Sequence, residues 1–153
     1  MAELGQSWAD ELALYEVEAH EAPRPTTAGG ETILVVEDEE LVRRLIVEVL
    51  TEQGYVVLPA RNGAEALALA AEQDRIDLVL TDLVMPGING RELAERLAES
   101  HGEARVLFMS GYGESVIVHR GVLEPETSFI EKPFTLAALA AEVRATLDRA
   151  GPA

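Results

Sequence analysis

Short apolar runs alternate with longer segments of helical character from residue 31 onward, and this alternation limits the fold more than any other feature. The apolar runs occupy residues 32–36, 55–58, 77–81, 105–109 and 128–130. The segments that follow them, in order, are residues 39–53, 64–73, 91–100, 114–120 and 136–149. Because the strand candidates are apolar throughout, we predict a parallel sheet buried under helices on both faces.

Five strands, each followed by a helix, define an α/β fold of the (βα)5 type, a three-layer sandwich. Crossovers between parallel strands are right-handed, which leaves few topologies for such a sheet. The commonest five-stranded arrangement is the flavodoxin-like order 2-1-3-4-5, and we predict it here. A chain of 153 residues is long enough for one domain of this kind with a tail.

Residues 1–30 differ in composition from the rest and are predicted to form an acidic N-terminal extension or linker. Prolines, threonines and glycines dominate its second part, a composition typical of linkers. Its first part favours a short amphipathic helix, because apolar residues recur among acidic ones at helical spacing. They are Leu4, Trp8, Leu12 and Tyr15. We therefore expect the folded domain to occupy residues 31–150.

Composition and charge exclude several classes of protein. A formal net charge of −16 without a basic stripe argues against nucleic acid and anionic membranes as partners. The lack of cysteine excludes disulfides, zinc–thiolate sites and cysteine nucleophiles. No apolar run approaches the roughly 18 residues of a membrane-spanning helix, and the acidic start is unlike a signal peptide. We expect a cytoplasmic protein.

Four of the five predicted strands end in polar residues that carry chemistry. Strand one is followed by Glu37 and Asp38, and strand three by Asp82. Strand four ends at Ser110 and strand five at Lys132. Open α/β sheets bind ligands beyond the carboxyl ends of their strands, at the point where the strand order reverses. We therefore expect these side chains to converge on one site.

Lys132 is the only lysine in a chain with 12 lysine and arginine residues, so every other basic side chain is an arginine. Lysine is a compact point charge on a thin stem, suited to reaching a single oxygen. Taken alone, this position would be an accident of composition. Its place at a strand end, in register with three other polar strand ends, favours a functional role.

Carboxylates gathered in one pocket need a positive partner. At 4 Å and an effective dielectric of about 20, each pair of carboxylates costs about 4 kcal/mol. Mg²⁺ suits such a site, because it is commonly held by one or two carboxylates together with waters and phosphate oxygens. A metal beside a carboxylate, a lysine and a hydroxyl is typical of phosphoryl transfer, in which an aspartate can be the nucleophile. We favour Asp82 as nucleophile and Glu37 and Asp38 as metal ligands.

Four segments, in this order and spacing, resemble the receiver domain of two-component response regulators: residues 33–40, 77–90, 109–112 and 131–134. The resemblance covers residues 31–149. It implies that Asp82 is the phosphoacceptor and that Mg²⁺ is bound by Glu37, Asp38, Asp82 and the backbone carbonyl of Val84. It further implies that Ser110 is the switch hydroxyl, Phe129 the switch aromatic and Lys132 the phosphate-contacting lysine.

The resemblance also implies the partners and the kind of activity. A receiver takes its phosphoryl group from a histidine kinase or a histidine phosphotransfer protein. It is a signalling domain, not an enzyme acting on external substrates. Its fourth helix, fifth strand and fifth helix form a face that mediates homodimers. The chain departs from the family in having Glu37 where aspartate is more usual, Phe129 without a tyrosine hydroxyl, and bulky residues at Val84 and Tyr112.

Several alternatives remain open at this point. The chain is either a free-standing regulator or the receiver of a hybrid kinase. A pseudo-receiver would bind partners without phosphorylation, against which the full set of acids, hydroxyl and lysine argues. Aspartate-nucleophile phosphatases carry a second acid where Val84 stands, and a flavodoxin-like cofactor binder would not place acids at residues 37–40. Ser110 as a turn cap and Phe129 as core packing are the structural alternatives, and the three histidines are expected at the surface.

Overall fold

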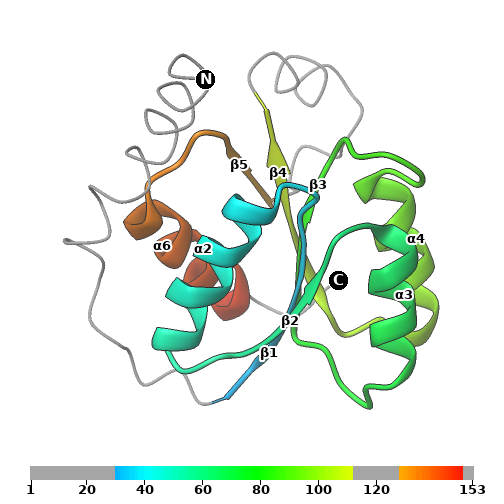
Figure 1. Ribbon diagram of the computed structural model, residues 1–153. Helices are drawn as coiled ribbons and strands as arrows, with labels where there is room; N and C mark the ends of the chain where they lie inside the picture. Colours follow the sequence, from blue (N-terminus) through cyan, green and yellow to red (C-terminus); the bar gives the residue numbers. More distant parts are fainter. Residues whose placement is uncertain (1–29, 112–127, 150–153) are drawn as a thin grey trace.

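The computed structural model of the chain describes residues 30–111 and 128–149 (Figure 1). Within these ranges five strands form one sheet in the order β2-β1-β3-β4-β5, and every neighbouring pair is parallel. The strands are β1 (Thr32–Val36), β2 (Val56–Ala60), β3 (Leu78–Asp82), β4 (Arg105–Ser110) and β5 (Ser128–Glu131). The predicted parallel sheet and its strand order are therefore confirmed.

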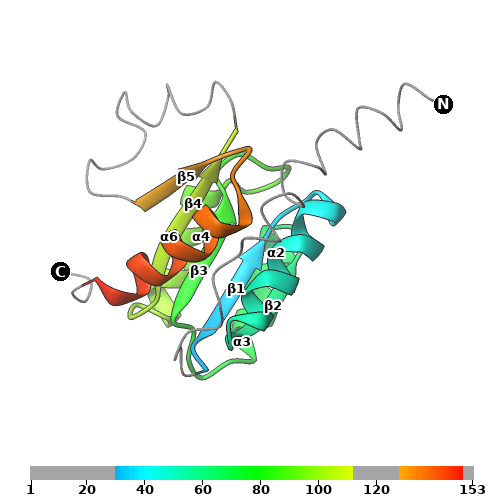
Figure 2. The same cartoon turned by 90° about the vertical axis from the view of Figure 1, so that its left-hand side faces the viewer.

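Helices cover both faces of the sheet, which gives the predicted three-layer sandwich. Helices α2 (Glu40–Glu52) and α6 (Leu136–Asp148) lie on one face, and α3 (Gly63–Ala71) and α4 (Gly90–Ser100) on the other (Figure 1). Figure 2 views the molecule with α2 and α6 in front of the sheet. The helix predicted at residues 114–120 and residues 1–29 of the extension predicted at residues 1–30 lie outside the described residues.

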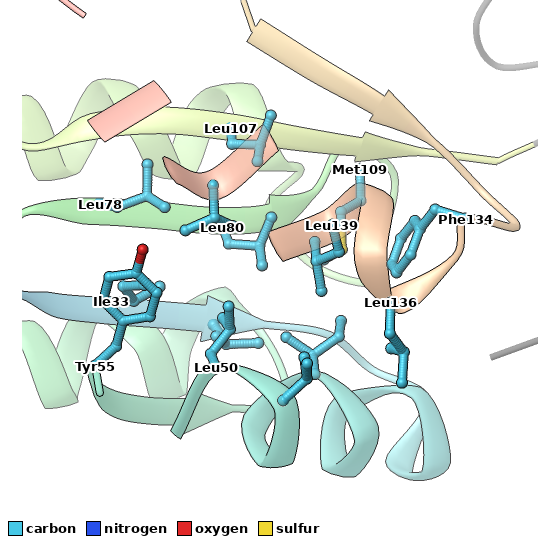
Figure 3. Packing of buried hydrophobic residues seen from close by; sticks show 14 of the residues in the cluster. Ile33, Leu50, Tyr55, Leu78, Leu80, Leu107, Met109, Phe134, Leu136 and Leu139 are labelled. Atoms are coloured by element: carbon cyan, nitrogen blue, oxygen red, sulfur yellow. The ribbon is translucent and has the colours of Figure 1, made fainter. Parts of the chain in front are cut away.

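Two apolar cores hold the layers together because both faces of the central strands are buried. Along β1, Ile33 and Val35 belong to the core under α2 and α6, whereas Leu34 and Val36 belong to the core under α3 and α4. Figure 3 shows the first core, where side chains of the helices meet those of β1, β3 and β4. Full burial of each large apolar side chain contributes about 1.5–3 kcal/mol. The cores thus fix the strands whose ends carry the site.

Three of the described helices begin with a side-chain cap, and each follows a loop at the carboxyl end of a strand. Asn62 accepts a hydrogen bond from the backbone of Glu65 at 2.8 Å, Asn89 does the same for α4, and Thr135 for α6. Helix α2 has no such bond from its own N-cap residue, Glu39. Glu37 instead contacts the start of α2: its Oε2 accepts the backbone N–H of Glu39, and its carbonyl accepts from Nη1 of Arg43. Local capping signals therefore explain the starts of α3, α4 and α6 but not of α2.

Strand β2 and one histidine differ from the sequence-based expectations. Strand β2 runs past Pro59 to Ala60, because β2 is an edge strand, where the missing N–H of proline is tolerated. His101 was predicted at the surface, which is wrong: it is only 5% exposed, and its Nε2 donates to the carbonyl of Gln73 at 2.9 Å. Among the described helices none is long and apolar enough to cross a membrane.

Candidate functional site

The side chain of Lys132 joins the ends of three strands. Its Nζ lies 2.6 Å from Oε1 of Glu37, which follows β1, and 2.8 Å from Oδ1 of Asp82, which ends β3. The backbone N–H of Lys132 donates to the carbonyl of Ser110 at 2.7 Å, so that the end of β5 is tied to the end of β4. The predicted convergence of these strand ends is therefore present in the structure.

The pocket is buried, although it is built from ionisable groups. Glu37 and Ser110 are fully buried, Asp82 is 4% exposed, and the Lys132 side chain is 18% exposed. Buried charges are strongly unfavourable unless they are paired. One ammonium group facing two carboxylates leaves an excess of negative charge. Within the described part of the chain, Asp82 Oδ2 and Ser110 Oγ are buried atoms without a hydrogen-bond partner.

The pKa values of the pocket reflect this excess of negative charge. Burial and the charge of Glu37 raise the pKa of Asp82 to about 8, and the attraction of Lys132 only partly offsets them. For Lys132, burial lowers the pKa, but the charges of Glu37 and Asp82 outweigh burial, and the pKa of Lys132 is raised overall. In the absence of a further cation, the pocket therefore favours a proton on Asp82 at neutral pH.

Three carboxylates are grouped closely enough to hold a metal ion. Glu37, Asp38 and Asp82 each offer one oxygen, and these oxygens lie within 4.8 Å of one another. Oxygen donors suit the hard cation Mg²⁺. The unpartnered Asp82 Oδ2 and the raised pKa of Asp82 indicate that a positive charge is needed there. The donor set therefore fits a divalent ion. Val84 is 59% exposed in the loop after Asp82, and the role of its carbonyl remains a prediction.

A glycine fixes the loop that carries Val84. The backbone N–H of Gly90 donates to the carbonyl of Leu83 at 2.8 Å, which closes the loop onto the end of β3. A Cβ at Gly90 would lie 2.1 Å from the backbone carbonyl oxygen of Asp82. No side chain fits in this space, so glycine is required for the close approach of α4 to the phosphoacceptor candidate.

The loop between β1 and α2 is held by a residue that sequence reasoning missed, Arg43. Its Nη1 donates to the carbonyl of Glu37 at 2.9 Å. The Glu37 carboxylate uses its other oxygen, Oε2, to accept the backbone N–H of Glu39 at 3.0 Å. The signal in the sequence was slight: a basic residue one turn into the helix that follows an acidic pair.

The two predicted switch residues lie on β4 and β5. Ser110 follows Met109, the residue paired with Asp82 in the sheet, and is fully buried. Phe129 is half-buried and packs with Leu83 and Phe108. These positions place both residues near the end of β3. Their switching roles are not tested by this placement and remain predictions.

The fold and the acidic pocket define a receiver domain of the two-component signalling class. The sequence pattern of the response regulator receiver domain matches residues 33–144. This match covers most of the chain, and the chain therefore belongs to the response regulator receiver domain family. Members of this family are signalling domains, not enzymes in the ordinary sense.

Several characterised proteins are similar to the chain in sequence. It is 36% identical to the sensor kinase CckA of Brucella abortus over 123 residues, which are 80% of this chain and 13% of CckA. It is 33% identical to the response regulator receiver protein CpdR of the same organism, over 75% of this chain and 95% of CpdR. Sporulation initiation phosphotransferase F of Bacillus subtilis is 34% identical, over 70% of this chain and 86% of that protein. The chain thus spans a small part of CckA but most of the other two.

Solved structures agree with the fold. The receiver domain of the hybrid histidine kinase CckA superposes with a TM-score of 0.65 at 36% identity, covering 76% of this chain and 99% of that domain. A response regulator receiver protein from Sinorhizobium medicae WSM419 has a TM-score of 0.67 at 28% identity, covering 78% of this chain and 95% of that chain. The similarity extends over nearly the whole of each solved structure.

Proposed function

We propose that the chain is a phosphoacceptor in a two-component phosphorelay. Asp82 takes a phosphoryl group from a histidine kinase or a histidine phosphotransfer protein, with Mg²⁺ as cofactor, and the modified domain changes its binding to partners. The observation that carries this proposal is the Lys132 ammonium group set between Glu37 and Asp82, with one buried oxygen of Asp82 left unpartnered. An aspartate in this position is equipped to be a nucleophile.

The proposed reaction transfers the phosphoryl group from nitrogen to oxygen. A carboxylate oxygen of Asp82 attacks the phosphorus, the phosphorus–nitrogen bond of the donor histidine breaks, and its electron pair stays on the imidazole. Asp82 must be ionised to attack, and a bound cation favours the ionised form by opposing the raised pKa. Lys132 then turns one or more N–H groups toward the phosphoryl oxygens, while Ser110 offers its hydroxyl hydrogen.

Mg²⁺, when bound, would neutralise the charge of the phosphoryl oxygens and of the carboxylates around it. We propose Glu37, Asp38, Asp82 and the backbone carbonyl of Val84 as the groups that hold it. Of the three carboxylates, Asp38 is the exposed one, whereas Glu37 and Asp82 are buried. Both oxygens of Glu37 already have partners, one the Lys132 ammonium and one the backbone N–H of Glu39. Glu37 therefore also serves as a fixed counter-charge.

The proposed switch connects the pocket to the β4–β5 side of the domain. Phosphorylation would draw Ser110 toward the phosphoryl group and let Phe129 repack against its neighbours, shifting the population between two conformations. The fourth helix, fifth strand and fifth helix of the (βα)5 unit are the proposed face for partners and for a homodimer. The fourth helix of the unit is the one predicted at residues 114–120, which lies outside the described residues. The fifth helix is α6, and the label α4 belongs to the third helix of the unit.

The setting of this domain has two versions. Similarity to CpdR and to phosphotransferase F over most of their lengths supports a free-standing regulator. Similarity to the CckA receiver domain supports the receiver of a hybrid kinase. In both versions residues 31–150 form the receiver and residues 1–30 an extension or linker. We propose the cytoplasm as the place where the domain works.

Acetyl phosphate with Mg²⁺, followed by intact mass measurement, tests the proposal. The wild type is expected to gain one phosphoryl group, and the gain should disappear in EDTA. Asp82→Asn is expected to gain none, whereas Glu40→Gln, which removes an exposed acid next to the site, should behave like the wild type. An Asp82→Asn protein modified as fully as the wild type would refute the assignment. A wild type that is never modified would favour the phosphorylation-independent pseudo-receiver.

A further inference from the structure

The Asp38 side chain lacks support of its own. It is exposed, and among the described residues no hydrogen bond or ion pair holds its carboxylate. The other two acids of the group are different: Glu37 and Asp82 are buried and each contacts Lys132. The position of the Asp38 carboxylate therefore depends on the backbone that carries it.

That backbone is fixed at three points around Asp38. The N–H of Glu37 donates to the carbonyl of Ala60 at 3.1 Å, which continues the pairing of β1 with β2. The N–H of Glu39 donates to Oε2 of Glu37 at 3.0 Å. The carbonyl of Glu37, which belongs to the peptide unit that begins Asp38, accepts from Nη1 of Arg43 at 2.9 Å. Two of these bonds are made by backbone groups and the Glu37 carboxylate. Only the third uses a side chain from outside the three acids, that of Arg43.

We propose that Arg43 is a positioning residue for metal binding: its guanidinium group fixes the Glu37–Asp38 peptide unit and thereby the Asp38 carboxylate. The proposal rests on the Mg²⁺ site of the proposed function. Arg43 lies on the second turn of α2 and is half-buried, so its side chain is held against the loop. It acts through a backbone carbonyl, and no ion pair joins it to the three acids among the described contacts.

The direction of the effect separates positioning from simple charge. A cation near a metal site repels the metal, so loss of the Arg43 charge alone would strengthen Mg²⁺ binding. Loss of a group that orients a metal ligand has the opposite effect and weakens metal binding by about 10–100-fold. If Arg43 acts by position, removing it will weaken binding even though the repulsion is relieved.

The neighbouring residue provides a matched control. Arg44 lies on the same helix and carries the same charge, but its side chain is 72% exposed, and its ion-pair partner is Glu40 at 3.9 Å. Arg44→Met removes one positive charge from the next position of the same helix without touching the Glu37 carbonyl. Arg43→Lys keeps a donor and the charge on a different stem, and it should restore part of the affinity.

Isothermal titration of the full chain with MgCl₂ is the test, with urea unfolding in EDTA as a check on folding. Arg43→Met is expected to bind Mg²⁺ about 10-fold more weakly than the wild type. Arg43→Lys should fall between them, and Arg44→Met should bind as tightly as the wild type or slightly more tightly. If Arg43→Met fails to fold, Arg43→Gln, whose shorter amide leaves the carbonyl unsupported, must show the same weakening.

Two results would contradict the inference, and they can be told apart. Mg²⁺ binding by Arg43→Met that equals or exceeds the wild type overturns the positioning role and leaves the metal site intact. A wild type that shows no Mg²⁺ binding overturns the proposed metal site and this inference together.

Discussion

The ammonium nitrogen of Lys132 lies 2.8 Å from Oδ1 of Asp82, although the strands that these residues terminate are separated in the sheet by β4. The lysine side chain therefore extends past the end of β4 to reach β3. The same nitrogen lies 2.6 Å from Oε1 of Glu37, which follows β1, the strand on the far side of β3. One flexible cation thus connects the ends of three strands and balances two buried carboxylates incompletely.

Replacing this cation should destabilise the metal-free protein. In Lys132→Met, the Glu37 and Asp82 carboxylates lose their partner, and breaking a buried pair in this way costs about 3–5 kcal/mol. Urea unfolding in EDTA at pH 8 measures the loss. Lys132→Arg keeps the charge and should lose less. Equal stability of Lys132→Met and the wild type would mean that the pair does not stabilise the fold.

The free energy of unfolding of the metal-free protein should depend on pH through Asp82. Its pKa in the folded protein is raised to about 8, so between roughly pH 4 and 8 the folded state binds more protons than the unfolded state. The stabilisation of the folded state by the proton on Asp82 is therefore complete below about pH 4. It is lost as the pH rises toward 8, by at most about 1.4 kcal/mol of unfolding free energy per pH unit. Mg²⁺ should oppose this loss.

Urea unfolding in EDTA, compared between the wild type and Asp82→Asn across this pH range, isolates the effect from the titration of other groups. The variant is expected to gain stability relative to the wild type as the pH rises. A constant difference between the two proteins would show that the pKa of Asp82 is not raised in the fold.

Gly90 should not tolerate a side chain. Because a Cβ at this position would lie 2.1 Å from the carbonyl oxygen of Asp82, Gly90→Ala must displace α4 or the end of β3. We expect a loss of about 1–3 kcal/mol, typical of overpacking, with weaker Mg²⁺ binding. Gly102→Ala is the control, because its nearest contact would be a milder 3.2 Å from the carbonyl of Ala98. Similar stabilities of the two variants would contradict the prediction.

Gly63 and Ile88 should behave as a coupled pair. A Cβ at Gly63 would lie 2.4 Å from Cγ1 of Ile88, a residue of the loop between β3 and α4. Gly63→Ala should therefore be destabilised by about 1–3 kcal/mol, and Ile88→Ala should recover part of this loss in the double variant. A double-mutant cycle by urea unfolding measures the coupling. Strictly additive effects would show that the two residues do not compete for space.

The sheet and the strand ends were predictable because both depend on local patterns. Unbroken apolar runs required strands buried on both faces, and parallel strands bring their carboxyl ends to one edge. Glu37, Asp38, Asp82 and Lys132 were therefore expected together from their positions at strand ends alone. Ser110 was expected at that edge for the same reason, and in the structure it is a buried residue at the end of β4.

The features that were missed or wrong depend on tertiary contacts between residues that leave no pattern. Arg43 binds a backbone carbonyl, which any residue at position 37 would offer. His101 is buried by its contact with the backbone of Gln73, a residue from a different loop. Strand β2 continues through Pro59 because it has only one neighbour in the sheet, an edge position that the predicted strand order already implied.

The role of Asp82 as phosphoacceptor is tested by locating the phosphoryl group on the chain. Borohydride reduces an aspartyl phosphate to homoserine, so treatment after incubation with acetyl phosphate and Mg²⁺ marks the modified residue for peptide mass analysis. Homoserine is expected at position 82. Homoserine at position 38, or a phosphoryl group on a residue other than Asp82, would contradict it.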